Sequence, residues 1–206
     1  MIKDMKIVLA SRNRHKIAEI ERVLKESGVT GVTLLSLDDI GYEGEIEETG
    51  TTFEENAYIK ACVPAKMGYY AIADDSGLEV DALGGRPGVY SARYAGEPCN
   101  DKNNNDKLLS ELETVPDDKR GAAFVSVIAF VDPNKIDEPV YFRGECKGTM
   151  IREERGNGGF GYDPLFYMPQ LNKTYAEINI DEKNAVSHRG QSIRQFAKYL
   201  TENKDL

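Results

Sequence analysis

The longest apolar run of the chain spans residues 122–131, and the turn Asp132-Pro133-Asn134 follows it. A second strand-like run covers residues 138–147, so the two runs predict a long antiparallel β-hairpin. Ser126 interrupts the first run, which is also too short for a membrane-spanning helix. A hairpin of this length limits the fold to those with a large sheet, and we expect no membrane partner.

Strand and helix patterns alternate on both sides of this hairpin. The strand patterns cover residues 6–10, 33–37, 69–73 and 165–167, and helix patterns begin near residues 17, 53, 101 and 187. We expect Asp101 and Ser187 to cap the last two helices, Pro64 to kink or shorten the second, and loops over 41–50, 81–100 and 152–164. The alternation, together with the hairpin, predicts an α/β fold whose mixed β-sheet is flanked by helices on both faces.

Composition narrows the class of protein. The 206 residues fit one domain, expected to span residues 1–206, and the net charge of −9 disfavours a nucleic-acid partner. The three cysteines, Cys62, Cys99 and Cys146, are odd in number and widely spaced, which disfavours a disulfide framework or a zinc site. With no signal peptide visible, we expect a cytoplasmic protein.

Two adjacent carboxylates, Asp74 and Asp75, come at the end of the apolar run 69–73 and lead into Ser76-Gly77. We therefore expect them at a strand end. Paired carboxylates in that position are typical of a Mg²⁺ site, because the ion takes a few carboxylate oxygens and leaves its other positions for water and phosphate. The alternative is a plain turn, since Asp, Ser and Gly all favour turns.

The first strand-to-helix turn is the best candidate for binding phosphate. A helix N-terminus offers unpaired backbone N–H groups and the positive end of the helix dipole. Ser11 and Asn13 add side-chain donors, and Lys16 lies one turn into the helix. The alternative is that Ser11 or Asn13 only caps the helix and that Lys16 is a solvated lysine.

Residues 156–161 match the glycine pattern of dinucleotide-binding turns, but the context is wrong. Pro164 disfavours a helix at Asp163, and that fold needs a helix there. The same glycines suit a loop that carries Phe160 over a planar base, with Asp163 accepting from a ring N–H. The alternative is that Phe160 is a core residue.

Two further polar clusters remain. Lys183, His188 and Arg189 place cations near the start of the last helix, where the helix dipole disfavours them, which hints at an anionic or carbonyl-rich ligand. Otherwise they are solvated, with Ser187 as a cap. Glu47-Glu48 is a second acidic pair that could complete a metal site, although most exposed pairs of this kind have no function.

Six segments in this order resemble one family. They are Ser11-x-Asn13-x-x-Lys16, Glu47-Glu48-Thr49-Gly50-x-Thr52-Phe53-x-Glu55-Asn56-Ala57, Ala73-Asp74-Asp75-Ser76-Gly77-Leu78, Gly84-Gly85-x-Pro87-Gly88-Val89-Tyr90-Ser91-Ala92-Arg93-Tyr94, Gly158-Gly159-Phe160-Gly161-Tyr162-Asp163-Pro164 and Ser187-His188-Arg189-Gly190. Over nearly the whole chain the sequence is similar to the Ham1-type inosine triphosphate pyrophosphatases. It departs from them in the bulky basic residues Arg12, Arg14 and His15, and in Pro64 and Ser192.

The resemblance implies an elongated two-lobed α/β fold with a substrate cleft, a homodimer, and Mg²⁺-dependent hydrolysis of ITP, dITP and XTP to the monophosphate and pyrophosphate. It implies that residues Ser11, Arg12, Asn13, Arg14, His15 and Lys16 hold phosphate and that Ser76 contacts substrate. Glu47 and Asp75 would serve the metal, with Asp75 as the general base and Asp74 in support. Phe160, Gly161, Tyr162, Asp163, Lys183, His188 and Arg189 would form the nucleoside pocket.

Two other readings stay open. A Maf-like pyrophosphatase acting on other modified nucleotides shares the reaction but not the 158–163 and 187–190 segments. A nucleotide-sensing module without hydrolysis would not need Glu47, Asp74 and Asp75.

Overall fold

The computed structural model describes residues 4–179, 182–183 and 186–203. Its sheet has the strand order β2-β1-β3-β4-β5-β6-β7. The strands are β1 (Met5–Leu9), β2 (Val32–Leu35), β3 (Tyr70–Val80), β4 (Gly121–Val131), β5 (Val140–Met150), β6 (Phe166–Met168) and β7 (Lys173–Thr174). Strand β1 runs parallel to β2 and β3, whereas β6 is antiparallel to β5 and β7. The predicted mixed α/β sheet is confirmed.

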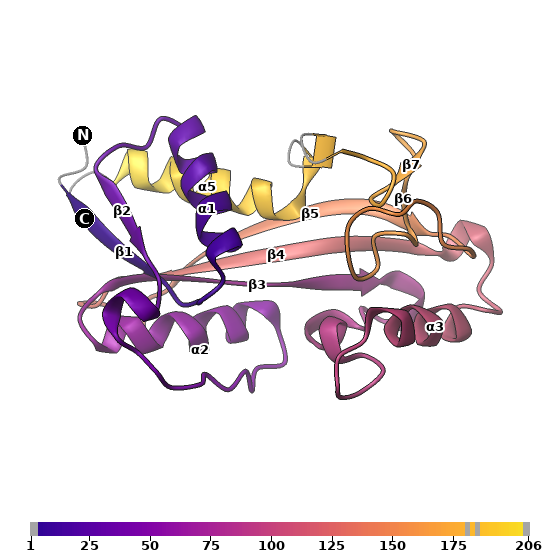
Figure 1. Cartoon of the computed structure of the whole chain (residues 1–206), viewed down its shortest axis with the longest axis horizontal. Coiled ribbons are helices and arrows are strands. Elements are labelled where there is room, and N and C mark those ends of the chain that lie inside the picture. The colour runs from indigo at the N-terminus through magenta and orange to yellow at the C-terminus, as the bar shows by residue number, and fades with distance from the viewer. Residues whose placement is uncertain (1–3, 180–181, 184–185, 204–206) are drawn as a thin grey trace. The chain divides into compact units, whose positions relative to one another are not determined.

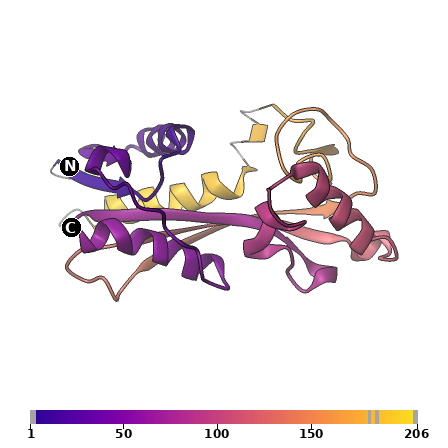
Figure 2. The same cartoon turned by 60° about the horizontal axis from the view of Figure 1, so that its bottom comes forward.

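Within the described residues, four long helices accompany the sheet: α1 (Arg14–Glu26), α2 (Phe53–Lys66), α3 (Asp101–Glu111) and α5 (His188–Glu202). Around β1 and the first half of β3, α2 lies on one face of the sheet, and α1 and α5 lie on the other (Figure 1). Figure 2 shows the same separation from a second direction. None of the described helices is long and apolar enough to cross a membrane.

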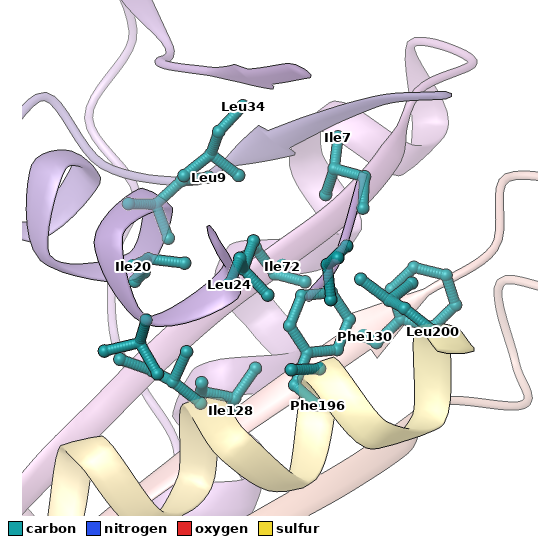
Figure 3. Packing of buried hydrophobic residues seen from close by; sticks show 14 of the residues in the cluster. Ile7, Leu9, Ile20, Leu24, Leu34, Ile72, Ile128, Phe130, Phe196 and Leu200 are labelled. Carbon is teal, nitrogen blue, oxygen red and sulfur yellow. The ribbon is translucent and has the colours of Figure 1, made fainter. Parts of the chain in front are cut away.

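The chain divides into two compact units, each with its own core. Unit 1 comprises residues 1–75, 126–144 and 189–206, and unit 2 comprises residues 76–125 and 145–188. In unit 1, apolar residues of α1 and α5 pack against β1, β3 and β4, with Ile20, Phe130 and Phe196 almost fully buried (Figure 3). In unit 2, Leu108 of α3 and Phe166 of β6 are fully buried in a second cluster. The substrate cleft expected between two lobes stays a prediction.

The helical spacing of the apolar residues accounts for α1. Ile17, Ile20, Val23 and Leu24 recur every three or four residues and are all buried, so one stripe of the helix faces the core. Gly28 follows the helix with a positive φ of 76°. A residue without Cβ adopts this conformation at little cost, so the chain can turn toward β2.

Three predictions of local structure need correction. Strand β3 does not end at Ala73 but continues through Asp74 and Asp75 to Val80, so the paired carboxylates lie within a strand and not in a turn. The cap of α3 is Asn100, whose side chain accepts from the backbone N–H of Asn103, and the predicted cap Asp101 is the first helical residue. The predicted loop 81–100 contains two 3₁₀ helices, over residues 81–83 and 88–93.

Pro64 lies inside α2, as its sequence position suggested, and the helix ends two residues later at Lys66. Its carbonyl accepts hydrogen bonds from the N–H groups of Met67 and Tyr69, so a tight turn joins this end of the helix to β3. At the other end Thr52 caps α2 by accepting from the N–H of Glu55. The Glu55 carboxylate in turn accepts from the backbone and side chain of Thr51. The predicted N-terminus of this helix is confirmed.

Candidate functional site

The turn between β1 and α1 leads directly into the N-terminus of α1, and its predicted binding of phosphate stays a prediction. Asn13 precedes the helix, and its side-chain oxygen accepts from the backbone N–H of Lys16 at 3.2 Å. Ser11 Oγ accepts from the N–H of Asn13 at 3.1 Å. Asn13 therefore caps the helix, and Ser11 orders the turn just before it, and neither contact excludes an anion from the other first-turn N–H groups.

Lys16 reaches from α1 to β3. Its ammonium nitrogen lies 3.0 Å from Asp74 Oδ1, and Arg189 Nε of α5 lies 3.4 Å from Asp74 Oδ2. The Asp74 side chain is only 1% exposed, so this carboxylate is buried between two cations. Glu19 of α1 holds the other side of Arg189, at 3.4 Å.

The electrostatics of Asp74 favour its ionised form. Burial by itself raises the pKa of a carboxyl, but Arg189 and Lys16 outweigh that effect and lower the pKa of Asp74 well below its ordinary value. The same pairing, led by Asp74, raises the pKa of Arg189. Asp74 is thus an anion that fixes the positions of two cations.

Asp75 has different neighbours. Lys60 of α2 donates to Asp75 Oδ1 at 3.1 Å and also lies 3.2 Å from Glu48 Oε2. Burial raises the pKa of Asp75 to about 6; Lys60 opposes this effect and the nearby Glu48 adds to it. A carboxyl with this pKa gains and loses a proton near neutral pH, as a general base must.

The contrast between the two carboxylates follows from strand geometry. Successive side chains of a strand point to opposite faces of the sheet, and the two faces of β3 carry different helices. Asp74 contacts α1 and α5, whereas Asp75 contacts α2. Because the strand continues past both residues, neither side chain can turn to the other face.

The acidic residues near Asp75 are compatible with Mg²⁺. Asp75 Oδ2 is buried and accepts no hydrogen bond of normal geometry from any described residue, so its bonding capacity is unused, although Asn56 also lowers the pKa of this carboxyl. Glu48 supplies a second carboxylate across Lys60. Within the described residues no cluster of three acidic, His or Cys side chains forms, but Mg²⁺ often takes only one or two carboxylates beside substrate phosphates. Glu47 is exposed, and its predicted metal role stays a prediction.

Unit 2 brings together a second group of predicted residues. The buried Asp163 accepts from the backbone N–H of Phe160 at 3.0 Å and from the ammonium group of Lys183. That ammonium group also lies 5.0 Å from the ring centre of Phe160 and 4.9 Å from that of Tyr175. Such contacts stabilise a lysine through cation–π attraction.

Phe160 is not a core residue. Its side chain is 71% exposed, although it belongs to the most apolar residue types. An exposed aromatic ring beside a lysine and a carboxylate offers stacking, a donor and an acceptor at one place. Gly159 makes the arrangement possible, because it has a φ of 72° and a Cβ there would collide with Asp163. The predicted contact of Phe160 with a planar base stays a prediction.

The other residues predicted for the nucleoside pocket have structural contacts. Tyr162 is buried, and its hydroxyl donates to the Ser91 carbonyl at 2.8 Å. Gly161 donates its N–H to Asp101 at 2.8 Å, and the His188 ring stacks on Phe124. Their substrate roles stay predictions, as does that of Ser76, which lies in β3.

The basic residues of the first turn point to a neighbouring loop. Arg12 binds Asp38 and two backbone carbonyls, and Arg14 lies 3.6 Å from Asp39. The side chain of His15 lies outside the described part of the structure. Their predicted phosphate contacts stay predictions.

The sequence analysis did not identify Lys60 or Glu19 as site residues, nor did it show that Glu48 shares Lys60 with Asp75. A signal for Lys60 exists, since Asn56 and Lys60 are polar residues four apart in a helix whose other residues include buried alanines. Glu19 has a weaker signal, because an acidic residue on an amphipathic helix is usually solvated.

Comparison with known proteins shows the family. The model of the Ham1 family matches residues 7–199. The chain belongs to the Ham1 family. Curated relatives include the dITP/XTP pyrophosphatases of Desulforamulus reducens, 48% identical over 95% of this chain and 96% of the relative, and of Geobacter sulfurreducens, 50% identical over 95% and 96%.

Solved structures agree. A Ham1 protein from Coxiella burnetii is 44% identical and matches with a TM-score of 0.89 over 96% of this chain and 99% of its own. A dITP/XTP pyrophosphatase from Mycobacterium abscessus is 49% identical, with a TM-score of 0.81 over 93% and 97%. The Ham1 fold expected from the sequence motifs is confirmed.

Proposed function

We propose that this Ham1 protein hydrolyses the non-canonical purine nucleoside triphosphates ITP, dITP and XTP to the monophosphate and pyrophosphate. The observation that carries the proposal is Asp75, a largely covered carboxylate of β3 that pairs with Lys60 and has a pKa of about 6. The relatives named as dITP/XTP pyrophosphatases support the choice of substrate. The single domain of residues 1–206 would remove deaminated purines from the nucleotide pool.

The residues of unit 1 have the properties that attack on phosphorus requires. Phosphoryl transfer depends mainly on positioning and on neutralising charge. Lys16 and the N-terminus of α1 would bind the triphosphate. Asp75 would accept a proton from a water molecule while the oxygen of that water forms a bond to the α-phosphorus. The bond from that phosphorus to the bridging oxygen breaks, and pyrophosphate leaves.

The implied Mg²⁺ would be held by Asp75 together with Glu47 or Glu48. When bound, it supplies charge neutralisation to the phosphates and lowers the pKa of a coordinated water. Lys60 already lies between Asp75 and Glu48, so it would keep the two carboxylates close to each other before the cation arrives.

Residues of unit 2 would select the purine base. Phe160 would stack on the purine, and Lys183 would donate to its 6-oxo group. An adenine amino group would meet a donor there and leave buried polar groups unpaired, at a cost of about 1–3 kcal/mol. GTP shares the oxo group and would be rejected less strongly. The predicted contact of Arg189 with the base belongs to the same proposal.

We further propose that the protein acts as a cytoplasmic homodimer, in line with the sequence resemblance. Size-exclusion chromatography with light scattering tests the dimer directly. A monomer across the working concentration range would overturn that part of the proposal without affecting the reaction.

The activity test is pyrophosphate release from ITP, XTP, dITP, GTP, ATP and TTP, with Mg²⁺ and with a chelator. We expect turnover of the first three, weak turnover of GTP and none without the metal. Preference for a modified pyrimidine would favour a Maf-like activity, and binding without release would favour a sensing module. In ¹⁸O-labelled water the label should enter the monophosphate; label in pyrophosphate would contradict attack at the α-phosphorus.

Base recognition has a separate test in Phe160. Phe160→Ala removes the stacking surface, so we expect KM for ITP to rise at least about tenfold. The melting temperature should hardly change, because the ring is mostly exposed. Tyr90→Ala, which truncates another exposed ring of unit 2, is the matched control. An unchanged KM in Phe160→Ala would remove Phe160 from the pocket.

A further inference from the structure

Arg12 occupies a variable slot of the phosphate turn, yet its side chain does not lie along the helix N-terminus. Its Nη2 donates to the carbonyls of Tyr42 and Gly44, at 2.8 and 2.9 Å. Its Nε donates to Asp38 Oδ1 at 3.2 Å. One guanidinium group therefore binds two backbone carbonyls and one carboxylate of the segment that follows β2.

The segment that Arg12 holds leads to the acidic pair. Residues 42–50, all of them described, form neither helix nor strand. The far end of this loop is fixed on α2, where Gly50 donates to Asn56 at 2.7 Å. A Cβ at Gly50 would collide with Asn56, so the loop and the helix are in close contact there. Arg12 provides the corresponding attachment at the near end.

Between these two attachments lie Glu47 and Glu48. Glu48 contacts Lys60, and Lys60 contacts Asp75. The backbone of Arg12, in turn, lies between Ser11 and Asn13, the two residues that shape the phosphate turn. A single residue thus connects the turn to the loop that brings a carboxylate toward Asp75.

We propose that Arg12 is a positioning residue: it fixes the loop 42–49 against the phosphate turn, and it acts on catalysis through Glu48 and not by touching substrate. The inference rests on the proposed function for its catalytic consequence, although the attachment itself does not. Arginine suits this task because its planar fork offers several donors in fixed directions, which a lysine ammonium does not reproduce.

The alternative role is the phosphate contact suggested by the sequence resemblance. The two roles separate on substitution. A phosphate contact needs mainly positive charge, so Arg12→Lys would retain most of it. Attachment of two carbonyls and a carboxylate needs the fork, so Arg12→Lys would lose much of it.

The test is hydrogen–deuterium exchange of the full-length protein without nucleotide or metal, for the wild type, Arg12→Ala and Arg12→Lys. Arg22→Ala is the matched control, because it removes an exposed arginine of α1 that pairs with Glu26 one turn further along the same helix. We expect peptides covering residues 41–49 to exchange at least about fivefold faster in both Arg12 variants. Peptides of α2 and of β3 should be unchanged.

Steady-state kinetics supply the second readout. For both Arg12 variants we expect the Mg²⁺ concentration that gives half-maximal rate to rise several-fold, on the order of 1 kcal/mol of lost cation affinity, with a lower kcat. Arg22→Ala should match the wild type in both measurements. Unchanged exchange over residues 41–49, or KM restored to the wild-type value by Arg12→Lys with normal exchange, would overturn the inference in favour of a phosphate contact.

The two proposals fail in different ways. If the wild-type protein releases no pyrophosphate from any nucleotide, the proposed function is wrong, and the exchange experiment still decides whether Arg12 fixes the loop. If the wild type is active but the loop exchanges normally in both variants, only the role of Arg12 is wrong.

Discussion

Asp74 and Asp75 are consecutive residues of one strand, and the two faces of β3 give them opposite properties. On one face Lys16 and Arg189 surround Asp74 and lower its pKa. On the other, burial raises the pKa of Asp75 to about 6, and the cation beside it, Lys60, is shared with Glu48. Two neighbouring aspartates can therefore differ in charge state, with one carboxylate always ionised and the other titrating near neutral pH.

The difference shows that an adjacent pair need not act as a unit. Mutual repulsion of two carboxylates would not predict which one keeps its proton. The cations of α1 and α5 decide this, because they compensate burial at Asp74 and leave Asp75 mostly uncompensated. We therefore propose that Asp74 holds Lys16 and Arg189 in place and that Asp75 transfers the proton.

The largest effect is expected from Asp75→Asn, which removes the base but keeps the shape. Turnover of ITP should fall by at least about 10³-fold, within the upper range for loss of a general base. Circular dichroism should show an unchanged fold. Asp118→Asn, at an exposed carboxylate, is the control. A kcat in Asp75→Asn comparable to that of the wild type would show that Asp75 is not the general base.

Asp74→Asn tests the other face. It leaves Lys16 and Arg189 without their shared anion, and breaking a buried ion pair on one side costs about 3–5 kcal/mol. We expect the lower end of this range, because Glu19 still holds Arg189. Urea unfolding at pH 7.5 measures the loss. A change below about 1 kcal/mol would mean that Asp74 does not hold the two cations.

Whereas Asp74→Asn should lower the free energy of unfolding, Asp75→Asn should raise it, by an amount that depends on pH. The folded-state pKa of Asp75 lies above its ordinary value of 3.8, so its ionisation destabilises the fold as pH rises from about 4 to 6. Asparagine mimics the protonated form. Asp75→Asn should be more stable than the wild type at pH 8, by up to roughly 3 kcal/mol, and the gain should shrink as pH falls from 6 to 4.

The same urea experiments decide this prediction when they are repeated between pH 4 and pH 8. A variant that is less stable than the wild type at pH 8 would show that ionised Asp75 is compensated in the fold, as Asp74 is. The two aspartates would then have similar environments, contrary to the structure.

The smallest effect is expected from Lys60→Met. Lys60 lowers the pKa of Asp75, so its removal should shift the acidic limb of the pH–rate profile to higher pH and lower kcat/KM at pH 7 by about tenfold. Lys66→Met, at an exposed lysine of the same helix, should leave the profile unchanged. A shift to lower pH would contradict the assigned contact.

Much of this organisation could be read from the sequence. Apolar spacing identified α1, and the Thr52–Glu55 pattern identified the start of α2, because both depend on local contacts. The glycines around Phe160 were correctly separated from a dinucleotide-binding turn, since Pro164 forbids the helix that such a turn needs. These are features that neighbouring residues determine.

What the sequence did not reveal depends on contacts distant along the chain. The aspartates were expected at the end of a strand that leads into a Ser-Gly turn, but pairing with neighbouring strands extends β3 through them to Val80. The separation of Asp74 from Asp75 arises from Lys16, Lys60 and Arg189, which come from three different helices. Likewise, nothing near Arg12 in the sequence indicates its bonds to residues 42 and 44.

The different roles of the two aspartates require that Asp75 titrates near neutral pH while Asp74 stays ionised. Carbon-13 NMR of protein labelled at aspartate carboxyls, titrated without metal, measures both groups, and Asp74→Asn and Asp75→Asn assign their signals. From this division of roles we expect a midpoint near 6 for a signal that is absent in Asp75→Asn, and an Asp74 signal that remains ionised to the acid limit of the folded state. A midpoint near the ordinary value for Asp75, or a high midpoint that disappears in Asp74→Asn, would contradict it.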